Sequence, residues 1–302
     1  MRKVIGIGET ILDIIFRNNQ PERAVPGGSV FNCMVSLARC GIPAYFMCEL
    51  GNDKVGKIIK DFMIENNLSP KYIDFLEGRS GHSFAFLDEQ QDASYQFFGG
   101  VYGDLFPTIL PEIQADDILI IGSLFAVELY NEKKFARLLR YAQKQKAIIY
   151  YDINFRKAHA EDRYKFSPNF IRNYKLSTIL RCSAEDLEVM YPHKTATETY
   201  RKYIAHHCPL FIVTQGEKEI LLMTETFEKS YPVEPFVPVS TIGAGDSFNA
   251  GIIYGLMLEN ILLEDIKDLP EYQWDKLIEY GKRFAATVCM SIENYVGENF
   301  IP

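Results

Sequence analysis

The 302-residue sequence predicts an α/β fold in which helices cover both faces of a mostly parallel sheet. From about residue 117, short continuously apolar segments alternate with helical stretches, as is typical of parallel strands buried on both faces. Earlier in the chain, strand-like segments at 83–87 and 94–98 flank the polar stretch 88–92, which indicates a hairpin. The length suits one large domain with a small β appendage, so we expect a single domain over 1–302.

The individual elements follow from apolar periodicity and from turn residues. Apolar residues recur at helical spacing after Ser29, and Gly41 followed by Pro43 ends that helix. In the first part of the chain we expect strands at 4–8 and 44–50 and helices at 29–40 and 53–66. In the second part we expect strands at 118–121, 147–153, 178–182, 210–214 and 219–223, and a last long helix at 274–294.

Composition narrows the class of protein. Hydrophobic residues make up 47% and charged residues 24%, as in an ordinary globular protein. The formal net charge is -8 with no basic block, which argues against nucleic-acid binding. No apolar run could span a bilayer and the N-terminus has no signal peptide, so we expect a cytoplasmic protein with no membrane partner. The six scattered cysteines include no CxxC pair and are expected to be reduced.

The segment 240–248, Ser-Thr-Ile-Gly-Ala-Gly-Asp-Ser-Phe, is the most informative motif. A glycine-rich turn that enters a helix exposes several backbone N–H groups at the positive end of the helix dipole, which suits a phosphate group. Asp246 follows at once and could take a proton from an alcohol that attacks that phosphate. The alternative is an ordinary turn with a stabilising acidic residue at the helix start.

Two other motifs point to different chemistry and are weaker. The run 6–9, Gly-Ile-Gly-Glu, follows the first strand as in nicotinamide-binding proteins, but Ile11 stands where the third glycine belongs. The run 206–208, His-His-Cys, offers metal ligands, but adjacent residues rarely bind one ion together. We interpret it as a helix end before the strand at 210–214.

Polar residues after the other strands could complete a ligand site at the carboxyl edge of the sheet. Asp13 could accept hydrogen bonds from sugar hydroxyls, or it could be a solvated turn residue. Gly27 and Gly28 open the first helix, where they either let a ligand approach the backbone or serve, with Ser29, as a helix cap. Asn32, one turn into that helix, could recognise a hydroxyl group.

Further polar residues follow the strands at 147–153, 178–182 and 210–214. Asp152, Asn154 and Arg156 share one face if the strand continues, and Arg156 could bind a phosphate or a sugar oxygen, or form a surface ion pair with Asp152. Glu185 could hold a water molecule on Mg²⁺, or stabilise a helix start. The run 214–217, Thr-Gln-Gly-Glu, suits a nucleotide pocket or a plain turn.

These motifs together resemble the ribokinase-like (PfkB) carbohydrate kinases, and the resemblance spans essentially the whole chain. Gly27, Gly28 and Asn32 with 37–41, Leu-Ala-Arg-Cys-Gly, resemble the first family signature, and 241–246, Thr-Ile-Gly-Ala-Gly-Asp, resembles the second. The runs 51–56, 214–216 and 285–289 fall in family order. Asp152-x-Asn154-x-Arg156 is similar to the fructokinase and 2-keto-3-deoxygluconate kinase branch.

The resemblance implies a three-layer α/β/α sandwich with a β lid from roughly 14–26 and 78–104. It implies Asp246 as catalytic base, with an anion hole at Gly243, Ala244 and Gly245. Sugar-binding positions are Asp13, Gly27, Gly28, Asn32 and Arg156; nucleotide-binding positions are Thr214, Gly216 and Thr241; and Glu185 organises Mg²⁺, through water.

Three residues depart from the family pattern. Cys182 stands where an asparagine of the Asn-x-x-Glu motif is expected, which affects part of the Mg²⁺ water network. Ser240 replaces an aspartate that helps to bind a monovalent cation in many members, so we predict weakened or absent K⁺ activation. Glu219 replaces a glycine common in the nucleotide turn.

The resulting hypothesis is an ATP-dependent carbohydrate kinase that uses Mg²⁺, with fructose as the favoured acceptor. The alternatives are a kinase for 2-keto-3-deoxygluconate, a sugar phosphate or a nucleoside, and a non-catalytic protein that binds sugar and nucleotide and acts as a regulator. A nicotinamide oxidoreductase is disfavoured by the missing glycine. The expected partners are small molecules and a second copy of the chain, because exposed Phe84, Phe86 and Phe97 in the lid would favour a homodimer.

Overall fold

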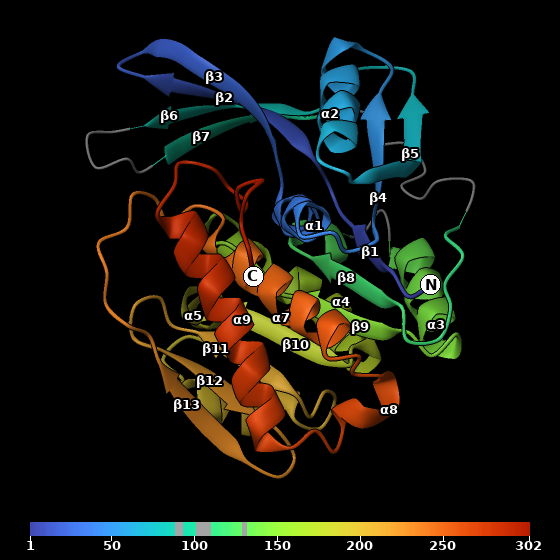
Figure 1. The fold of residues 1–302 in the computed structure, drawn as a ribbon, viewed down its shortest axis with the longest axis vertical. Helices are drawn as coiled ribbons and strands as arrows, with labels where there is room; N and C mark the ends of the chain where they lie inside the picture. Colours follow the sequence, from blue (N-terminus) through green and yellow to red (C-terminus); the bar gives the residue numbers. More distant parts are fainter. Residues whose placement is uncertain (88–92, 101–109, 129–131) are drawn as a thin grey trace.

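The computed structural model describes residues 1–87, 93–100, 110–128 and 132–302 (Figure 1). Within these residues nine strands form one main sheet and four strands form a smaller separate sheet. Helices lie on both faces of the main sheet, so the predicted three-layer α/β/α arrangement is confirmed. In the described part of the chain, no helix is long and apolar enough to cross a membrane.

The main sheet is mostly parallel. Its strands are β1 Val4–Ile7, β4 Ala44–Gly51, β5 Ser69–Leu76, β8 Ile118–Gly122, β9 Ile148–Asp152, β10 Ile179–Ser183, β11 Phe211–Thr214, β12 Glu219–Met223 and β13 Glu228–Pro232. Their order is β13-β12-β11-β10-β9-β8-β1-β4-β5, and β12 and β13 are antiparallel additions at one edge. The sequence predicted all but β5 and β13, which lack the continuous burial that marks the central strands.

Helices cover the two faces of the main sheet in separate layers. The helices are α1 Ser29–Arg39, α2 Lys54–Glu65, α3 Glu132–Lys144, α4 Arg163–Leu176, α5 Ala184–Met190, α6 Ala196–Thr199, α7 Ala244–Leu258, α8 Leu263–Ile266 and α9 Glu271–Cys289, with short turns η1 Leu124–Ala126, η3 Lys157–Asp162 and η4 Tyr200–Ile204. Alternate strand residues face opposite cores, because side chains in a strand point to opposite sides. Ile148 and Tyr150 of β9 pack on the face covered by α1, α7 and α9, whereas Ile149 and Tyr151 face α3 and α4.

The small sheet corresponds to the expected lid. Its strands are β2 Ile11–Arg17, β3 Gln20–Gly27, β6 His82–Leu87 and β7 Ala93–Phe98, in the order β3-β2-β6-β7. The antiparallel pairing of β6 with β7 confirms the predicted hairpin, while the parts of the expected lid at 88–92 and 101–104 lie outside the described residues. Figure 1 shows this sheet set apart from the main one, above the start of α7.

The prediction that the lid aromatics are all exposed is wrong for two of them. Phe97 keeps 64% of its surface exposed, but Phe84 and Phe86 are half-buried. Both pack against Phe16 of β2, with ring centroids 5.4 and 4.9 Å away. The parallel pairing of β2 with β6 brings these rings together, and the hairpin pattern alone did not reveal that partner strand.

The last helix also differs from its predicted range. It begins at Glu271, directly after Pro270, and ends at Cys289 rather than near residue 294. The Cys289 carbonyl accepts hydrogen bonds from the N–H groups of Val239 (2.7 Å) and Ser240 (3.3 Å). The end of α9 therefore holds the segment that leads into α7.

Candidate active site

The N-terminus of α7 lies at the carboxyl edge of the main sheet and begins with a left-handed glycine. Gly243 has φ 80° and precedes the first helical residue, Ala244. A Cβ atom at Gly243 would lie 2.4 Å from the carbonyl oxygen of Asn294, so only glycine fits. The Ala244 N–H makes a long 3.3 Å bond to the Thr241 carbonyl. The turn directs the first N–H groups of α7, at the positive end of its dipole, toward the edge of the sheet.

Asp246, in the first turn of α7, is held by two donors from α1. The Ser29 hydroxyl donates to one carboxylate oxygen at 2.7 Å, and the Asn32 amide donates to the other at 2.8 Å. Burial raises the pKa of Asp246 above its ordinary value, while these two bonds and the Arg156 and Arg181 cations limit the rise. The result is a fixed carboxylate that is more basic than an exposed aspartate.

Asp13 and the double glycine fit against one another. Asp13 accepts a short hydrogen bond from Ser83 of β6, and a Cβ atom at Gly27 would lie 2.4 Å from the other Asp13 oxygen. Gly28, with φ 140°, is the N-cap of α1, and a Cβ atom there would meet the Glu9 carbonyl oxygen at 2.5 Å. Burial raises the pKa of Asp13, with Ser83 and Arg156 acting in the opposite direction. The two glycines are therefore required by the Asp13 carboxylate and by the backbone after β1.

Asp152, Asn154 and Arg156 were expected to share one face if the strand continued, and the strand does not continue. β9 ends at Asp152, and Asn154 has φ 38°, which breaks the alternation of a strand. The Asn154 amide donates to Ser123 at 2.8 Å, whereas Asp152 is buried and pairs with Arg181 rather than with Arg156. Arg156 is exposed, and its positive charge lowers the pKa of both Asp13 and Asp246 against the effect of burial.

The residues predicted for the nucleotide and for Mg²⁺ lie at the end of β11, in the turn after it, just before α7 and at the start of α5. Thr214 ends β11, and Gly216, with φ 59°, forms the turn to β12. Thr241 is exposed just before α7. Glu185 is exposed in the first turn of α5, where its neighbour Asp186 is buried and bonded to the Ser183 backbone and hydroxyl at 2.8 Å.

The three residues that depart from the family pattern, Cys182, Ser240 and Glu219, have different surroundings. The Cys182 side chain is fully buried in the core beneath α3 and α4, which is the face opposite to α7. The Ser240 hydroxyl accepts a hydrogen bond from the Ile242 N–H at 3.2 Å. Glu219 accepts hydrogen bonds from Gln215 and Ser230, so it ties the turn between β11 and β12 to β13.

The sequence analysis did not identify Arg181, which is central to the site. Arg181 is 5% exposed, and its guanidinium pairs with Asp152 at 3.1 Å and donates to Thr214 at 2.5 Å. The signal was present, because an arginine stands between Leu180 and Cys182 in an otherwise apolar central strand. Charged residues are almost never fully buried unless they are paired.

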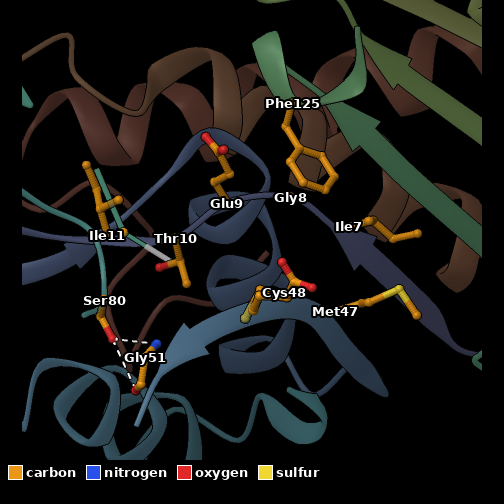
Figure 2. Close-up of a pocket in the computed structure, with 13 residues that line it drawn as sticks. Ile7, Gly8, Glu9, Thr10, Ile11, Met47, Cys48, Gly51, Ser80 and Phe125 are labelled. Atoms are coloured by element: carbon orange, nitrogen blue, oxygen red, sulfur yellow. Dashed lines mark hydrogen bonds between the residues drawn. The ribbon is translucent and has the colours of Figure 1, made fainter. Parts of the chain in front are cut away.

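A small cavity, partly open to solvent, adjoins the double glycine (Figure 2). Thr10 connects the two features, because its hydroxyl donates to the Gly27 carbonyl at 3.0 Å. The residues that line the cavity are Ile7, Gly8, Glu9, Thr10, Ile11, Met47, Cys48, Glu49, Gly51, Ser80, Gly81, Gly100 and Phe125. They include two glutamates and neither lysine nor arginine.

Glu9 gives this cavity an unusual acid. Its side chain is exposed and lines the open part of the cavity. Desolvation by the surrounding protein, and then repulsion from Glu128, raise the pKa of Glu9 to about 7. The cavity wall thus changes charge near neutral pH.

Comparison with known proteins identifies relatives along almost the whole chain. The family model described as "pfkB family carbohydrate kinase" matches residues 1–295. A fructokinase of Rhizobium leguminosarum bv. trifolii is 25% identical over 86% of this chain and 81% of its own length. A 5-dehydro-2-deoxygluconokinase of Geobacillus thermodenitrificans (strain NG80-2) is 25% identical over 76% of this chain and 72% of its own length.

The fold itself is found in a solved structure. The crystal structure of a fructokinase from Vibrio cholerae O395, bound to fructose, ADP and calcium ion, superposes with a TM-score of 0.84. The two chains are 19% identical, and the match covers 97% of this chain and 94% of the other. The likeness in fold therefore extends over both the main sheet and the small sheet.

Proposed function

The chain belongs to the pfkB family of carbohydrate kinases, and we propose that it transfers the γ-phosphoryl group of ATP to a hydroxyl group of fructose. The observation that carries the proposal is the position of Asp246. Its carboxylate is fixed by Ser29 and Asn32 in the first turn of α7, directly after the glycine turn. A base and a phosphate-binding helix N-terminus thus meet at one point.

In the proposed reaction, Asp246 takes the proton of an acceptor hydroxyl group. The acceptor oxygen forms a bond to the γ-phosphorus, the bond from that phosphorus to the β,γ-bridging oxygen breaks, and ADP leaves. The raised pKa of Asp246 supports this role, since a more basic carboxylate is a better proton acceptor near neutral pH. Asp13 and Asn32 would hold the acceptor in place through its other hydroxyl groups.

The glycine turn would stabilise the charge that develops on the transferred group. The N–H groups at 243–245 and the dipole of α7 present fixed positive charge, which needs no reorganisation during the reaction. Glu185 and Asp186 offer carboxylate oxygens at the start of α5, which are the ligand type that Mg²⁺ prefers. When bound with ATP, Mg²⁺ would neutralise charge on the phosphate oxygens.

The acidic cavity favours a neutral acceptor over an anionic one. Glu9 and Glu49 line it, and a carboxylate or phosphate placed there would meet like charge once these side chains are ionised, which for Glu9 is above a pKa of about 7. Fructose carries no charge, whereas 2-keto-3-deoxygluconate and sugar phosphates do. The relatedness to fructokinases supports the same choice.

One observation favours an acidic acceptor instead. Arg156 is an exposed cation near both Asp13 and Asp246, and it could bind a carboxylate or a phosphate. The relative named 5-dehydro-2-deoxygluconokinase supports this second candidate. The two candidates differ in the charge of the acceptor, which is absent in fructose and would face Arg156 in an acidic acceptor.

The test is release of ADP from Mg·ATP with a matched set of acceptors: fructose, fructose 6-phosphate, 2-keto-3-deoxygluconate and a nucleoside. We expect fructose to give the highest kcat/KM. Turnover restricted to 2-keto-3-deoxygluconate or to the phosphate would assign the acceptor charge to Arg156. Calorimetric binding of sugar and ATP without turnover of any acceptor would replace the kinase proposal by the regulator.

A further inference from the structure

Arg181 occupies a central position beneath the glycine turn. Its neighbours in β10, Leu180 and Cys182, face α3 and α4, so the Arg181 side chain points to the opposite face, which α7 covers. Asp152 of β9 lies beside it in register, and Thr214 ends the next strand, β11. Three adjacent strands therefore place an acid, a cation and a hydroxyl side by side at the carboxyl edge.

The contacts fix the guanidinium group in one orientation. One terminal nitrogen lies 3.1 and 3.3 Å from the two Asp152 oxygens, and the other donates to the Thr214 hydroxyl at 2.5 Å. Asp152 is in turn bonded by the Asn249 amide of α7 at 2.7 Å, and Asn249 accepts from the Tyr150 hydroxyl at 2.9 Å. The pair is thus held from β9, β11 and α7 together.

The guanidinium packs directly against the glycine turn. A Cβ atom at Gly245 would lie 3.0 Å from both terminal nitrogens of Arg181, which is closer than a side chain normally approaches. The Arg181 cation also lowers the pKa of Asp246. The buried Arg181 cation therefore contacts Gly245, which belongs to the turn and precedes the proposed base Asp246, and Thr214, which is predicted to bind nucleotide.

Stability alone gives a poor account of this arrangement. Replacing a buried ion pair by apolar residues is often neutral or stabilising, because removing two charges from water is costly. The Arg181 Nε atom is also buried without a hydrogen-bond partner in the described residues, which adds to the cost. Because the buried Arg181–Asp152 pair is costly to stability and lies at the site, we infer that it has a functional role.

We propose that Arg181 is a positioning residue for phosphoryl transfer, which holds the 243–245 turn and places fixed positive charge behind the transferred phosphoryl group. This inference rests on the proposed kinase function. Arg181 acts through the backbone of Gly245 and does not touch the phosphoryl group itself. Its effect should be larger in the transition state than in the complex with ATP, because the turn is proposed to fit the planar, in-line phosphoryl group, which forms only as the reaction proceeds.

The experiment compares the wild type with Arg181→Met, Arg181→Lys and the double variant Asp152→Asn/Arg181→Met. The double variant removes both charges, so its thermal unfolding should return toward that of the wild type. With fructose and Mg·ATP, we expect kcat of Arg181→Met to fall roughly 10- to 100-fold, less than the loss of a direct anion-hole donor. The KM values should change little, the double variant should keep the low kcat, and lysine should recover part of it.

A second readout is independent of the acceptor. The affinity for Mg·ADP is measured by calorimetry with and without aluminium fluoride, which mimics a phosphoryl group in transfer. The enhancement by fluoride should fall in Arg181→Met and in the double variant, while the affinity for Mg·ADP alone is retained. Arg172→Met is the matched control, because Arg172 bonds to the Ala126 carbonyl on the α4 side of the sheet and should leave the enhancement unchanged.

Two results would overturn the role of Arg181. One is recovery of kcat in the double variant, which would mean that only the unpaired Asp152 charge was harmful. The other is an unchanged fluoride enhancement in Arg181→Met, or no enhancement in the wild type. Lack of turnover by the wild type with any acceptor would remove the proposed function, and the fluoride comparison would still decide the role of Arg181.

Discussion

Two acidic regions adjoin the double glycine, and they differ in what surrounds the carboxylate: hydrogen-bond donors in one and like charge in the other. At the start of α7, Asp246 receives hydrogen bonds from Ser29 and Asn32 and is near two cations. On the wall of the cavity after β1, Glu9 is exposed, and desolvation by the surrounding protein and then repulsion from Glu128 raise its pKa. Both are carboxylates with a raised pKa, and two hydrogen-bond donors orient the carboxylate of Asp246.

This difference suggests that two functions, proton acceptance and selection of the acceptor, are carried by different carboxylates at the same edge of the sheet. A proton acceptor must be charged before the reaction and must point in a fixed direction, which requires hydrogen-bond donors. A cavity wall that selects an acceptor needs only its charge and shape. We therefore expect substitutions at Asp246 to act on kcat, at Asp13 and its glycine on KM, and at Glu9 on pH dependence.

The largest effect is expected for Asp246→Asn, which keeps the shape and removes the base. The kcat should fall roughly 10²- to 10⁴-fold, with little change in ATP affinity. Steady-state kinetics and calorimetry with ATP measure the two quantities. Asp61→Asn is the control, since Asp61 pairs with Lys57 at the surface of α2. Full turnover by Asp246→Asn would eliminate it as the base.

A smaller effect is expected for Gly27→Ala. The added Cβ would lie 2.4 Å from an Asp13 oxygen, so the carboxylate must move. We expect the KM for the acceptor to rise roughly 10-fold or more, with a smaller change in kcat, because Asp13 binds the ground state and the transition state alike. Gly297→Ala is the control, because a Cβ there meets nothing within 4 Å. An unchanged KM would show that Asp13 does not hold the acceptor.

The smallest effect is expected for Glu9→Gln and concerns stability against pH. The folded-state pKa of about 7 exceeds the ordinary value of 4.5, so the folded protein binds more protons between these values and Glu9 costs stability as pH rises through that window. Glu9→Gln should raise Tm by roughly 2 °C at pH 8 and leave it unchanged at pH 4.

Thermal unfolding at the two pH values measures this difference. Glu65→Gln, at the exposed end of α2, is the matched control and should give the same Tm shift at both pH values. An equal Tm gain for Glu9→Gln at pH 4 and pH 8 would contradict the raised pKa of Glu9.

Much of the fold could be predicted because local patterns specify it. Continuous apolar runs identified the central strands. The hairpin of β6 and β7 followed from two β-forming runs on either side of a polar stretch. β5 and β13 were missed because their half-exposed residues lack such runs. The end of α9 was missed; there the Cys289 carbonyl accepts hydrogen bonds from Val239 and Ser240, which are distant in sequence and which the local pattern does not reveal.

By itself, the sequence determined the parallel sheet, the glycine turn before Asp246 and the family to which the chain belongs. These features are local in sequence, so spacing and residue type reveal them. The tertiary structure alone decided that Ser29 and Asn32 orient Asp246, that Ser83 binds Asp13, and that Arg181 pairs with Asp152 beneath Gly245. Such contacts join residues from different strands and helices, and only the packing of those elements brings them together.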